Sequence, residues 1–187
     1  MRRIAPIAFA VVSLACAVTA SAADAPALPE STWAPLKMEA GTWDAAITFY
    51  EQDKVSGTGK GVQTNTLLAN GHWIVNDFNI PATDKFPVYQ GHGVWGYDPV
   101  AKTYVDTWVD TNDLAVRTDY GYWDAASNTM SWSSKQPDGA GHFIDYRMTE
   151  EFRGDTRTLT FYQLGLLKPN PHTLIRIVFT RRKDGHS

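Results

Sequence analysis

Beyond residue 22 the sequence has no cysteine, no apolar run of membrane-spanning length and no excess of basic residues. The single cysteine, Cys16, lies in an N-terminal segment that we expect to be removed. The remaining chain would then have no disulfide, thiolate metal site or cysteine nucleophile. Loss of Arg2 and Arg3 leaves 15 of the 17 basic residues against 20 acidic ones, a net charge of −5. That charge argues against nucleic acid and anionic membranes as partners, and we expect no membrane insertion.

Residues 1–22 have the features of a secretory signal peptide. A basic start precedes an apolar stretch, 4–18, that is too short to span a membrane, and Ala20-Ser21-Ala22 is a small-residue cleavage signature. Cys16 leaves a lipidated alternative open, although Ser13 stands where a lipidation signal usually has leucine. We therefore predict cleavage after Ala22 and a periplasmic or secreted product.

The rest of the chain has the length of one domain. Residues 23–30 read as a Pro/Ala-rich linker and residues 31–187 as the domain. A short helical turn is predicted over 33–38, with Ser31 or Thr32 as its cap. From Gly41 onward the pattern alternates with the period of two that is typical of strands. We predict strands near 42–50, 60–68, 72–80, 91–98, 102–110, 114–124, 129–136, 141–152, 156–166 and 173–183.

Turn-forming residues separate these strands. Asn70-Gly71 is the strongest hairpin signal, and Asp98-Pro99 predicts a tight turn inside residues 91–110. About ten short strands without intervening helices indicate a sandwich or a barrel, and successive hairpins favour an up-and-down barrel, whose closure removes exposed edges. The predicted fold class is all-β: a single antiparallel up-and-down barrel with a short N-terminal helical turn.

Two glycine patterns resemble nucleotide-binding loops but lack their context. Gly91 to Gly96 matches G-x-G-x-x-G, yet a turn follows it instead of the helix that the dinucleotide motif needs. We interpret these glycines as making room for bulky side chains across a curved strand. Gly57, Gly59 and Gly61 lack the Lys-Ser/Thr of a phosphate loop and are interpreted as a bend.

A series of motifs resembles the DUF1579 family. In order along the chain they are Gly41-Thr-Trp43, Gly57-Thr-Gly59, Leu68-Ala-Asn-Gly-His-Trp73, Gly91-His-Gly-Val-Trp-Gly-Tyr-Asp98, Trp108-Val-Asp110 and Tyr122-Trp-Asp124. The resemblance covers essentially the whole chain after the signal peptide. It implies an antiparallel calycin-like barrel in a family whose function is not established.

The Gly-x-Trp at Gly41 to Trp43 is also similar to the lipocalin signature. In lipocalins an arginine late in the last strand packs over that tryptophan and closes the barrel base. The resemblance implies that Arg181 or Arg182 does this by a cation–π contact, which would make Trp43 structural.

The residues 105–110 alternate so that Asp106, Trp108 and Asp110 share one face of a strand and Val105, Thr107 and Val109 share the other. One of these faces must look inward in a barrel. If the Asp/Trp face looks inward, the barrel contains a polar, aromatic-lined cavity, as small barrels with a ligand do. If the Val/Thr face looks inward, the Asp/Trp face is solvated. The sequence leaves both arrangements open.

Arg147 lies in the middle of a predicted strand, where a carboxylate such as Asp106, Asp110 or Asp77 would pair with it if it were buried. A buried arginine could bind an anionic ligand head, whereas an arginine on the outer wall would have no such role. Arg176 presents the same alternatives.

Motifs for catalysis and for metal binding are absent from the sequence. There is no Gly-x-Ser-x-Gly elbow or His-Glu-x-x-His, and Glu150 and Glu151 are adjacent, so they point to opposite faces of a strand. No histidine spacing suggests zinc, although His72 and His92 each begin a predicted strand and could meet at one barrel rim. An axial haem ligand, as in nitrobindin-like barrels, is an alternative role for a histidine, but none matches that ligand. We predict no cofactor.

The leading hypothesis is a monomeric or weakly dimeric barrel that binds a small, largely apolar molecule. Apolar walls would come from Trp73, Trp95, Trp108 and Tyr162, while Arg147 and Asp110 would orient one polar group. The alternatives are an enzyme acting on a small lipid-like or aromatic substrate in the same cavity, a haem-binding barrel, and a barrel filled by its own aromatic side chains.

Overall fold

The protein is described by a computed structural model covering residues 28–83, 87–137, 142–164 and 172–183. The predicted signal peptide and most of the predicted linker lie outside the described residues. Among the described residues, no helix is long and apolar enough to cross a membrane.

All ten predicted strands are present, and each overlaps the range that the alternation predicted for it. A 3-10 turn η1 (Glu30–Trp33) and a helix α1 (Ala34–Glu39) precede them. The strands are β1 (Gly41–Glu51), β2 (Lys54–Leu67), β3 (Trp73–Ile80), β4 (Tyr89–Asp98), β5 (Thr103–Asp110), β6 (Arg117–Asp124), β7 (Thr129–Pro137), β8 (Phe143–Arg153), β9 (Thr156–Gln163) and β10 (His172–Arg181).

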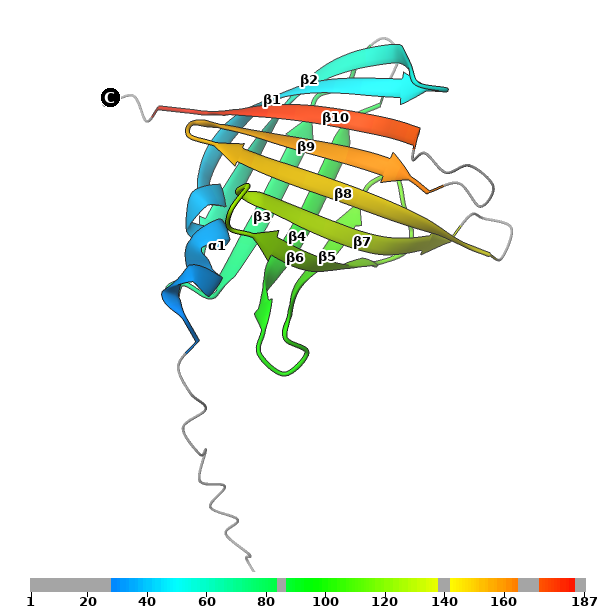
Figure 1. Ribbon diagram of the computed structural model, residues 1–187. Coiled ribbons are helices and arrows are strands. Elements are labelled where there is room, and N and C mark those ends of the chain that lie inside the picture. Colours follow the sequence, from blue (N-terminus) through cyan, green and yellow to red (C-terminus); the bar gives the residue numbers. More distant parts are fainter. Residues whose placement is uncertain (1–27, 84–86, 138–141, 165–171, 184–187) are drawn as a thin grey trace, which may run out of the picture.

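The strands form one closed antiparallel barrel in which each strand pairs with its neighbours in the sequence. β1 pairs with both β2 and β10, and this pairing closes the barrel. Figure 1 shows this up-and-down arrangement, with α1 lying at one end of the barrel. The predicted fold class is confirmed.

Helix α1 covers one end of the barrel, which we call the closed end. Pro35 and Leu36 are buried there. The Tyr104 hydroxyl donates to the Thr32 carbonyl at 2.8 Å, and Arg181 Nη2 donates to the Met38 carbonyl at 2.6 Å. These bonds link the helical segment to strands far away in the sequence, so the closed end is fixed by the barrel itself.

The helical segment begins differently from the prediction. The 3-10 turn starts at Glu30 and neither helical element has a side-chain cap, so the capping role predicted for Ser31 or Thr32 is wrong. The long-range bonds from Tyr104 and Arg181 hold the segment instead.

Trp43 packs beneath an arginine of the last strand, as the lipocalin resemblance implied. The guanidinium carbon of Arg181 lies 4.1 Å from the centre of the Trp43 ring, and Trp43 Nε1 donates to the Glu39 carbonyl at 2.8 Å. Arg182 is exposed and pairs with Asp44 at 2.6 Å. Arg181 is therefore the residue that closes this end of the barrel.

The glycines of β4 make room for tryptophans, as predicted. A Cβ atom at Gly91 or Gly93 would lie 2.2 Å or 2.5 Å from the indole of Trp108, and one at Gly96 would lie 2.6 Å from the ring of Trp73. The close approach of these indoles to the backbone requires glycine, so the resemblance to a nucleotide motif is a consequence of packing.

The bend predicted at Gly57, Gly59 and Gly61 is wrong, because these residues lie within the 14-residue strand β2. The chain reverses earlier, at Gln52 and Asp53, whose φ angles are 51° and 62°. Pairing along the whole of β1 extends β2 despite its glycines.

Candidate functional site

The barrel encloses a cavity of about 510 Å³, which we call the lumen cavity. Its walls come from inward-facing apolar side chains of most strands, including Ile47, Phe49, Phe78, Trp95, Trp108, Leu159, Phe161 and Ile177. Residues of the connections β3–β4 and β5–β6, among them Pro81, Pro87 and Ala115, also line it. These connections lie at the end opposite α1, so we call that end the mouth. The alternative of a barrel filled by its own aromatic side chains is wrong.

Strand β5 turns its Asp/Trp face inward. Asp106 and Trp108 are buried and line the cavity, whereas Thr107 and Val109 are exposed. This resolves the two arrangements that the sequence left open.

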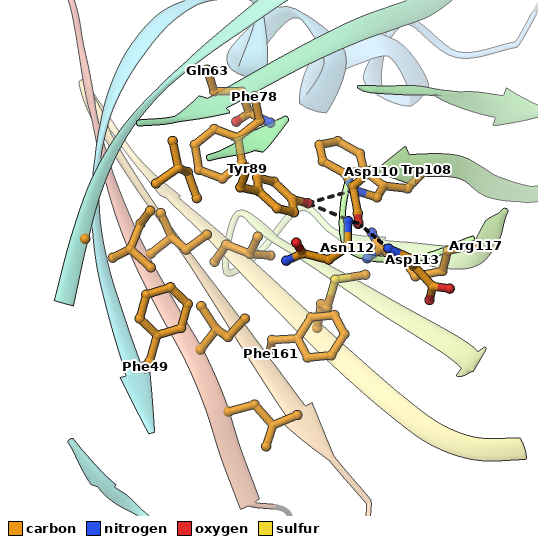
Figure 2. Close-up of a pocket in the computed structure, with 18 of the residues that line it drawn as sticks. Phe49, Gln63, Phe78, Tyr89, Trp108, Asp110, Asn112, Asp113, Arg117 and Phe161 are labelled. Atoms are coloured by element: carbon orange, nitrogen blue, oxygen red, sulfur yellow. Dashed lines mark hydrogen bonds between the residues drawn. The ribbon is translucent and has the colours of Figure 1, made fainter. Parts of the chain in front are cut away.

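A group of three hydrogen-bonded side chains stands near the mouth. Trp108 Nε1 donates to the Tyr89 hydroxyl oxygen at 3.0 Å and to Asp110 Oδ2 at 3.1 Å, and the Tyr89 hydroxyl lies 3.2 Å from the same carboxylate oxygen. Figure 2 shows the three side chains converging, with Phe161 across the cavity. Burial and the neighbouring carboxylate raise the pKa of the Tyr89 hydroxyl, so it remains protonated at neutral pH.

Asp110 also organises the loop that follows β5. Its Oδ1 accepts hydrogen bonds from the backbone N–H groups of Asn112 at 2.8 Å and Asp113 at 3.0 Å. Both carboxylate oxygens therefore have partners within the protein. Asp110 stabilises the loop that forms part of the mouth.

Deeper in the barrel, Arg157 is the centre of a buried ionic network. It is 2% exposed and contacts the side chains of Glu150 and Gln63, and its Nη1 lies 3.2 Å from Glu39 Oε1. Its guanidinium carbon lies 3.9 Å from the ring centre of Phe179. Two carboxyl groups thus share one arginine.

Glu39 lies at the junction of this network with helix α1. Asn76 Nδ2 donates to Glu39 Oε1 at 2.8 Å and Asn65 Nδ2 donates to it at 3.1 Å. Burial, and next the charge of Glu150, raise the pKa of Glu39 to about 8 against the opposing effect of Arg157. At neutral pH the network therefore keeps a proton, as expected for two acids sharing one cation.

A second polar group crosses β5, β6 and β7 at one level of the wall. Asp106, Asp119 and Ser134 are consecutive partners in the strand pairing, and we call them the polar belt. Arg117 Nε donates to Asp119 Oδ2 at 2.7 Å, and Arg117 Nη2 lies 3.8 Å from Asp106 Oδ2. Burial, and next the charge of Asp119, raise the pKa of Asp106 to about 7.

The structure divides the predicted site residues into two sets. Trp95, Trp108 and Asp110 line the lumen cavity, and their contact with a ligand stays a prediction. Trp73, Arg147 and Tyr162 do not line it, and the interior position expected for them is wrong. Their neighbours Ile74, Met148 and Phe161 point inward, so alternation turns these three outward.

Among the described residues, the arginines that line the lumen cavity are Arg117 and Arg157, and neither was predicted as a site residue. Arg147 and Arg176 are both exposed on the outer wall. The sequence did contain a signal for Arg157. It lies on the same face of β9 as the apolar residues Leu159 and Phe161, which indicates an inward position.

His72 and His92, which the sequence allowed to meet at one rim, do not meet. In the pairing of β3 with β4, His92 lies opposite Asp77. His72 precedes Trp73, which lies opposite Gly96, so the two histidines are at different levels of the barrel. His72 stacks on Trp33 with ring centres 4.1 Å apart. No described histidine lines the lumen cavity, and the described residues contain no group of three or more metal-ligating side chains. A histidine-ligated haem thus has no ligand among the described lining residues.

Fold and site together define a class: a closed ten-stranded antiparallel barrel with an interior cavity, closed by a short helix at one end. Residues 29–181 match the family described as "Protein of unknown function (DUF1579)", and the chain belongs to this family. The crystal structure of Rv2717c from M. tuberculosis is similar, with a TM-score of 0.60 and 9% sequence identity, over 84% of this chain and 100% of that chain. That likeness shows the fold alone. No curated protein matches the chain.

Proposed function

We propose that this barrel binds a small, largely apolar molecule in the lumen cavity. The observation that carries the proposal is the cavity itself, about 510 Å³ of space that the protein's own side chains leave unfilled. This volume lies within the range of roughly 300–1,000 Å³ that is typical of small-molecule sites. Its apolar lining would contribute most of the binding free energy through the hydrophobic effect.

The position of the polar groups supports the same proposal. Polar lining residues gather around Asp110 at the mouth and around Arg157 deep in the barrel, and Phe49, Phe78 and Phe161 form part of the apolar wall. A ligand with a long apolar body fits this distribution. Trp95 and Trp108 are the predicted wall residues that would contact it.

A side chain that fills the cavity tests the proposal. Leu159 lines the cavity, while the next residue, Thr160, lies on the outer face of the same strand. We expect Leu159→Trp to abolish the fluorescence enhancement of the neutral dye Nile red, and Thr160→Trp, the matched control, to preserve it. Equal dye binding by both variants, with circular dichroism showing that both are folded, would contradict binding in the lumen.

Export belongs to the same proposal. The features of residues 1–22 support release of the barrel into the periplasm or the medium after cleavage at Ala22. The intact mass of the protein recovered from the periplasm should correspond to a chain that starts at Ala23. Native mass spectrometry of this material would also detect a retained ligand.

A second candidate function is an enzyme acting on a small lipid-like or aromatic substrate in the same cavity. Asp106 favours it, since a carboxyl group with a pKa raised to about 7 can both donate and accept a proton at neutral pH. Screening of lipid-like and aromatic esters, ethers and ketones is the test. Turnover that is lost in Asp106→Asn while Nile red binding is retained would establish catalysis.

A further inference from the structure

Two uncharged polar side chains, Gln136 and Tyr146, line the lumen cavity. Both residues are half-buried, and neither side chain makes a hydrogen bond with another described residue. Within the described part of the chain, every fully buried polar side-chain atom that lacks a partner belongs to another residue. The amide of Gln136 and the hydroxyl of Tyr146 are therefore open to water or to a ligand in the cavity.

The register of β7 and β8 brings these two side chains together. Gln136 lies opposite Ile144, and Tyr146 lies opposite Ser134. Gln136 and Tyr146 are thus diagonal neighbours on the inner face, about 7–8 Å apart, a separation within reach of long and aromatic side chains. We call them the amide–hydroxyl pair. Gln136 is the next to last residue of β7, so the pair lies toward the mouth.

The wall beside the amide–hydroxyl pair, on the side of the closed end, is largely apolar. Met148 is the next inward residue of β8 after Tyr146. It lies opposite Trp132 of β7 and Phe161 of β9, and all three side chains line the cavity. The ring centre of Phe161 is 5.3 Å from that of Tyr146. A polar pair toward the mouth and an apolar wall behind it match a molecule with one polar end and an apolar body.

We propose that the amide–hydroxyl pair of Gln136 and Tyr146 binds the uncharged polar head of an amphipathic ligand, whose apolar body extends into the lumen cavity. This inference rests on the proposed function and names the ligand class: molecules with a carboxamide or a hydroxyl group at one end. These heads both donate and accept hydrogen bonds, as the glutamine amide does. The orienting role predicted for Arg147 and Asp110 falls to the pair, because Arg147 is exposed on the outer wall. Both oxygens of Asp110 already have partners in the protein.

Displacement of water gives the amide–hydroxyl pair its selectivity. A ligand body that fills the cavity removes water from both side chains. An apolar end would then leave their donors and acceptors without partners, which weakens binding, whereas a carboxamide or hydroxyl head restores the hydrogen bonds. Burial raises the pKa of the Tyr146 hydroxyl, so this group stays protonated and can donate at neutral pH.

The surroundings of the cavity disfavour a charged head. Arg117 pairs with Asp119 at 2.7 Å, and Arg157 contacts both Glu150 and Glu39. A carboxylate head would therefore find these two arginines already paired with acidic groups. An ammonium head has donors but no acceptor, so it would leave the N–H groups of the glutamine amide without a partner.

Isothermal titration calorimetry with ligands that share one apolar body tests the inference. 1-Naphthaleneacetamide carries a carboxamide head, 1-ethylnaphthalene carries no head, and 1-naphthaleneacetic acid and 2-(1-naphthyl)ethylamine carry charged heads. The variants are Gln136→Leu, which removes the amide, and Tyr146→Phe, which removes only the hydroxyl. We expect each variant to lose about threefold to tenfold in affinity for the carboxamide, and to bind the hydrocarbon at least as tightly as the wild type. The acid and the amine should bind the wild type more weakly than the carboxamide.

The matched controls are Gln90→Leu and Tyr122→Phe, which make the same changes at exposed positions outside the lumen cavity. Neither control should change the affinity for the carboxamide or for the hydrocarbon. If a variant of the amide–hydroxyl pair fails to fold, the wild type decides with the N,N-dimethyl derivative of the carboxamide. This derivative cannot donate a hydrogen bond and should bind more weakly than the carboxamide, and equal or tighter binding refutes the inference.

Three outcomes would overturn the inference. Equal changes in affinity for the carboxamide and the hydrocarbon in both variants would show that the pair recognises no polar head, while leaving the proposed function intact. Tightest binding of the acid or the amine would assign a charged ligand. Binding of neither neutral ligand would refute the inference alone if Nile red still binds, and would refute it together with the proposed function if Nile red does not.

Discussion

Removing the buried charge of Arg157 should destabilise the barrel strongly. Arg157→Met keeps the length of the apolar stem but leaves Glu39 and Glu150 in the interior without a cation. Loss of one partner of a buried ion pair typically costs about 3–5 kcal/mol, because the remaining charge has neither water nor a counter-ion. The contact of the guanidinium with Phe179, at 3.9 Å, is lost as well. We therefore expect the free energy of unfolding to fall by about 3–5 kcal/mol.

Urea unfolding followed by tryptophan fluorescence measures this change, provided that the slope against urea concentration is the same in both proteins. The matched control is Arg153→Met, which removes an arginine that is exposed on β8 and pairs with Glu151 at 2.9 Å. A surface pair of this kind contributes about 1 kcal/mol or less. Arg157→Met with a loss below about 1 kcal/mol would refute the argument that the network is held by its charge.

The carboxyl groups of the network provide an internal check. If the cost comes from unpaired acids, Glu150→Gln should restore about 1 kcal/mol or more in the Arg157→Met background, while it destabilises the wild type. Losses that simply add would indicate that packing, and not charge, accounts for the effect of Arg157→Met.

Two further predictions concern proton binding and strand packing. The pKa of Glu39, about 8, and that of Asp106, about 7, lie above the ordinary values of 4.5 and 3.8, so the folded protein binds more protons than the unfolded chain between those limits. These two groups should therefore make the free energy of unfolding fall steadily from about pH 4.5 to pH 8.5, by at least about 2 kcal/mol, since one pKa unit corresponds to about 1.4 kcal/mol. Urea titrations at each pH measure this fall; Glu39→Gln should flatten it, and stability that rises over this range would contradict the assignment. Gly93→Ala places a Cβ atom 2.5 Å from the indole of Trp108 and should cost about 1–3 kcal/mol. In Gly59→Ala the nearest atom is 3.7 Å away, so the thermal midpoint should fall for Gly93→Ala alone, and equal midpoints would refute the packing argument.

The strands of this barrel were predictable because their alternation and their turns agree. Asn70-Gly71 and Asp98-Pro99 each separate two alternating runs, and the structure reverses at both places. Strand β2 shows where this reasoning fails. Glycine has no side chain to reveal a face, so Gly57, Gly59 and Gly61 hid the alternation, and only pairing with β1 extends the strand through them.

The site was less predictable, since alternation assigns residues to two faces without saying which face is inside. In β8 the inward face carries Tyr146, Met148 and Glu150, and in β9 it carries Arg157. Both strands therefore turn ionisable side chains inward, while Arg147 and Tyr162 lie outside. A rule based on hydrophobicity alone cannot anticipate a buried arginine, because its burial depends on carboxyl groups from other strands.

For β5 the same rule would have chosen Val105, Thr107 and Val109 as the inward face, and it would have been wrong. The deciding feature lies on the neighbouring strand. Counting back from the turn at Asp98-Pro99 pairs Trp108 with Gly93, and the indole fills the space that Gly91 and Gly93 leave open. The large indole fits because glycines stand opposite it, and its N–H donates to Tyr89 and Asp110. Asp106 shares this face of β5 and is therefore carried inward by alternation, where Asp119 and Arg117 of β6 surround its carboxyl group.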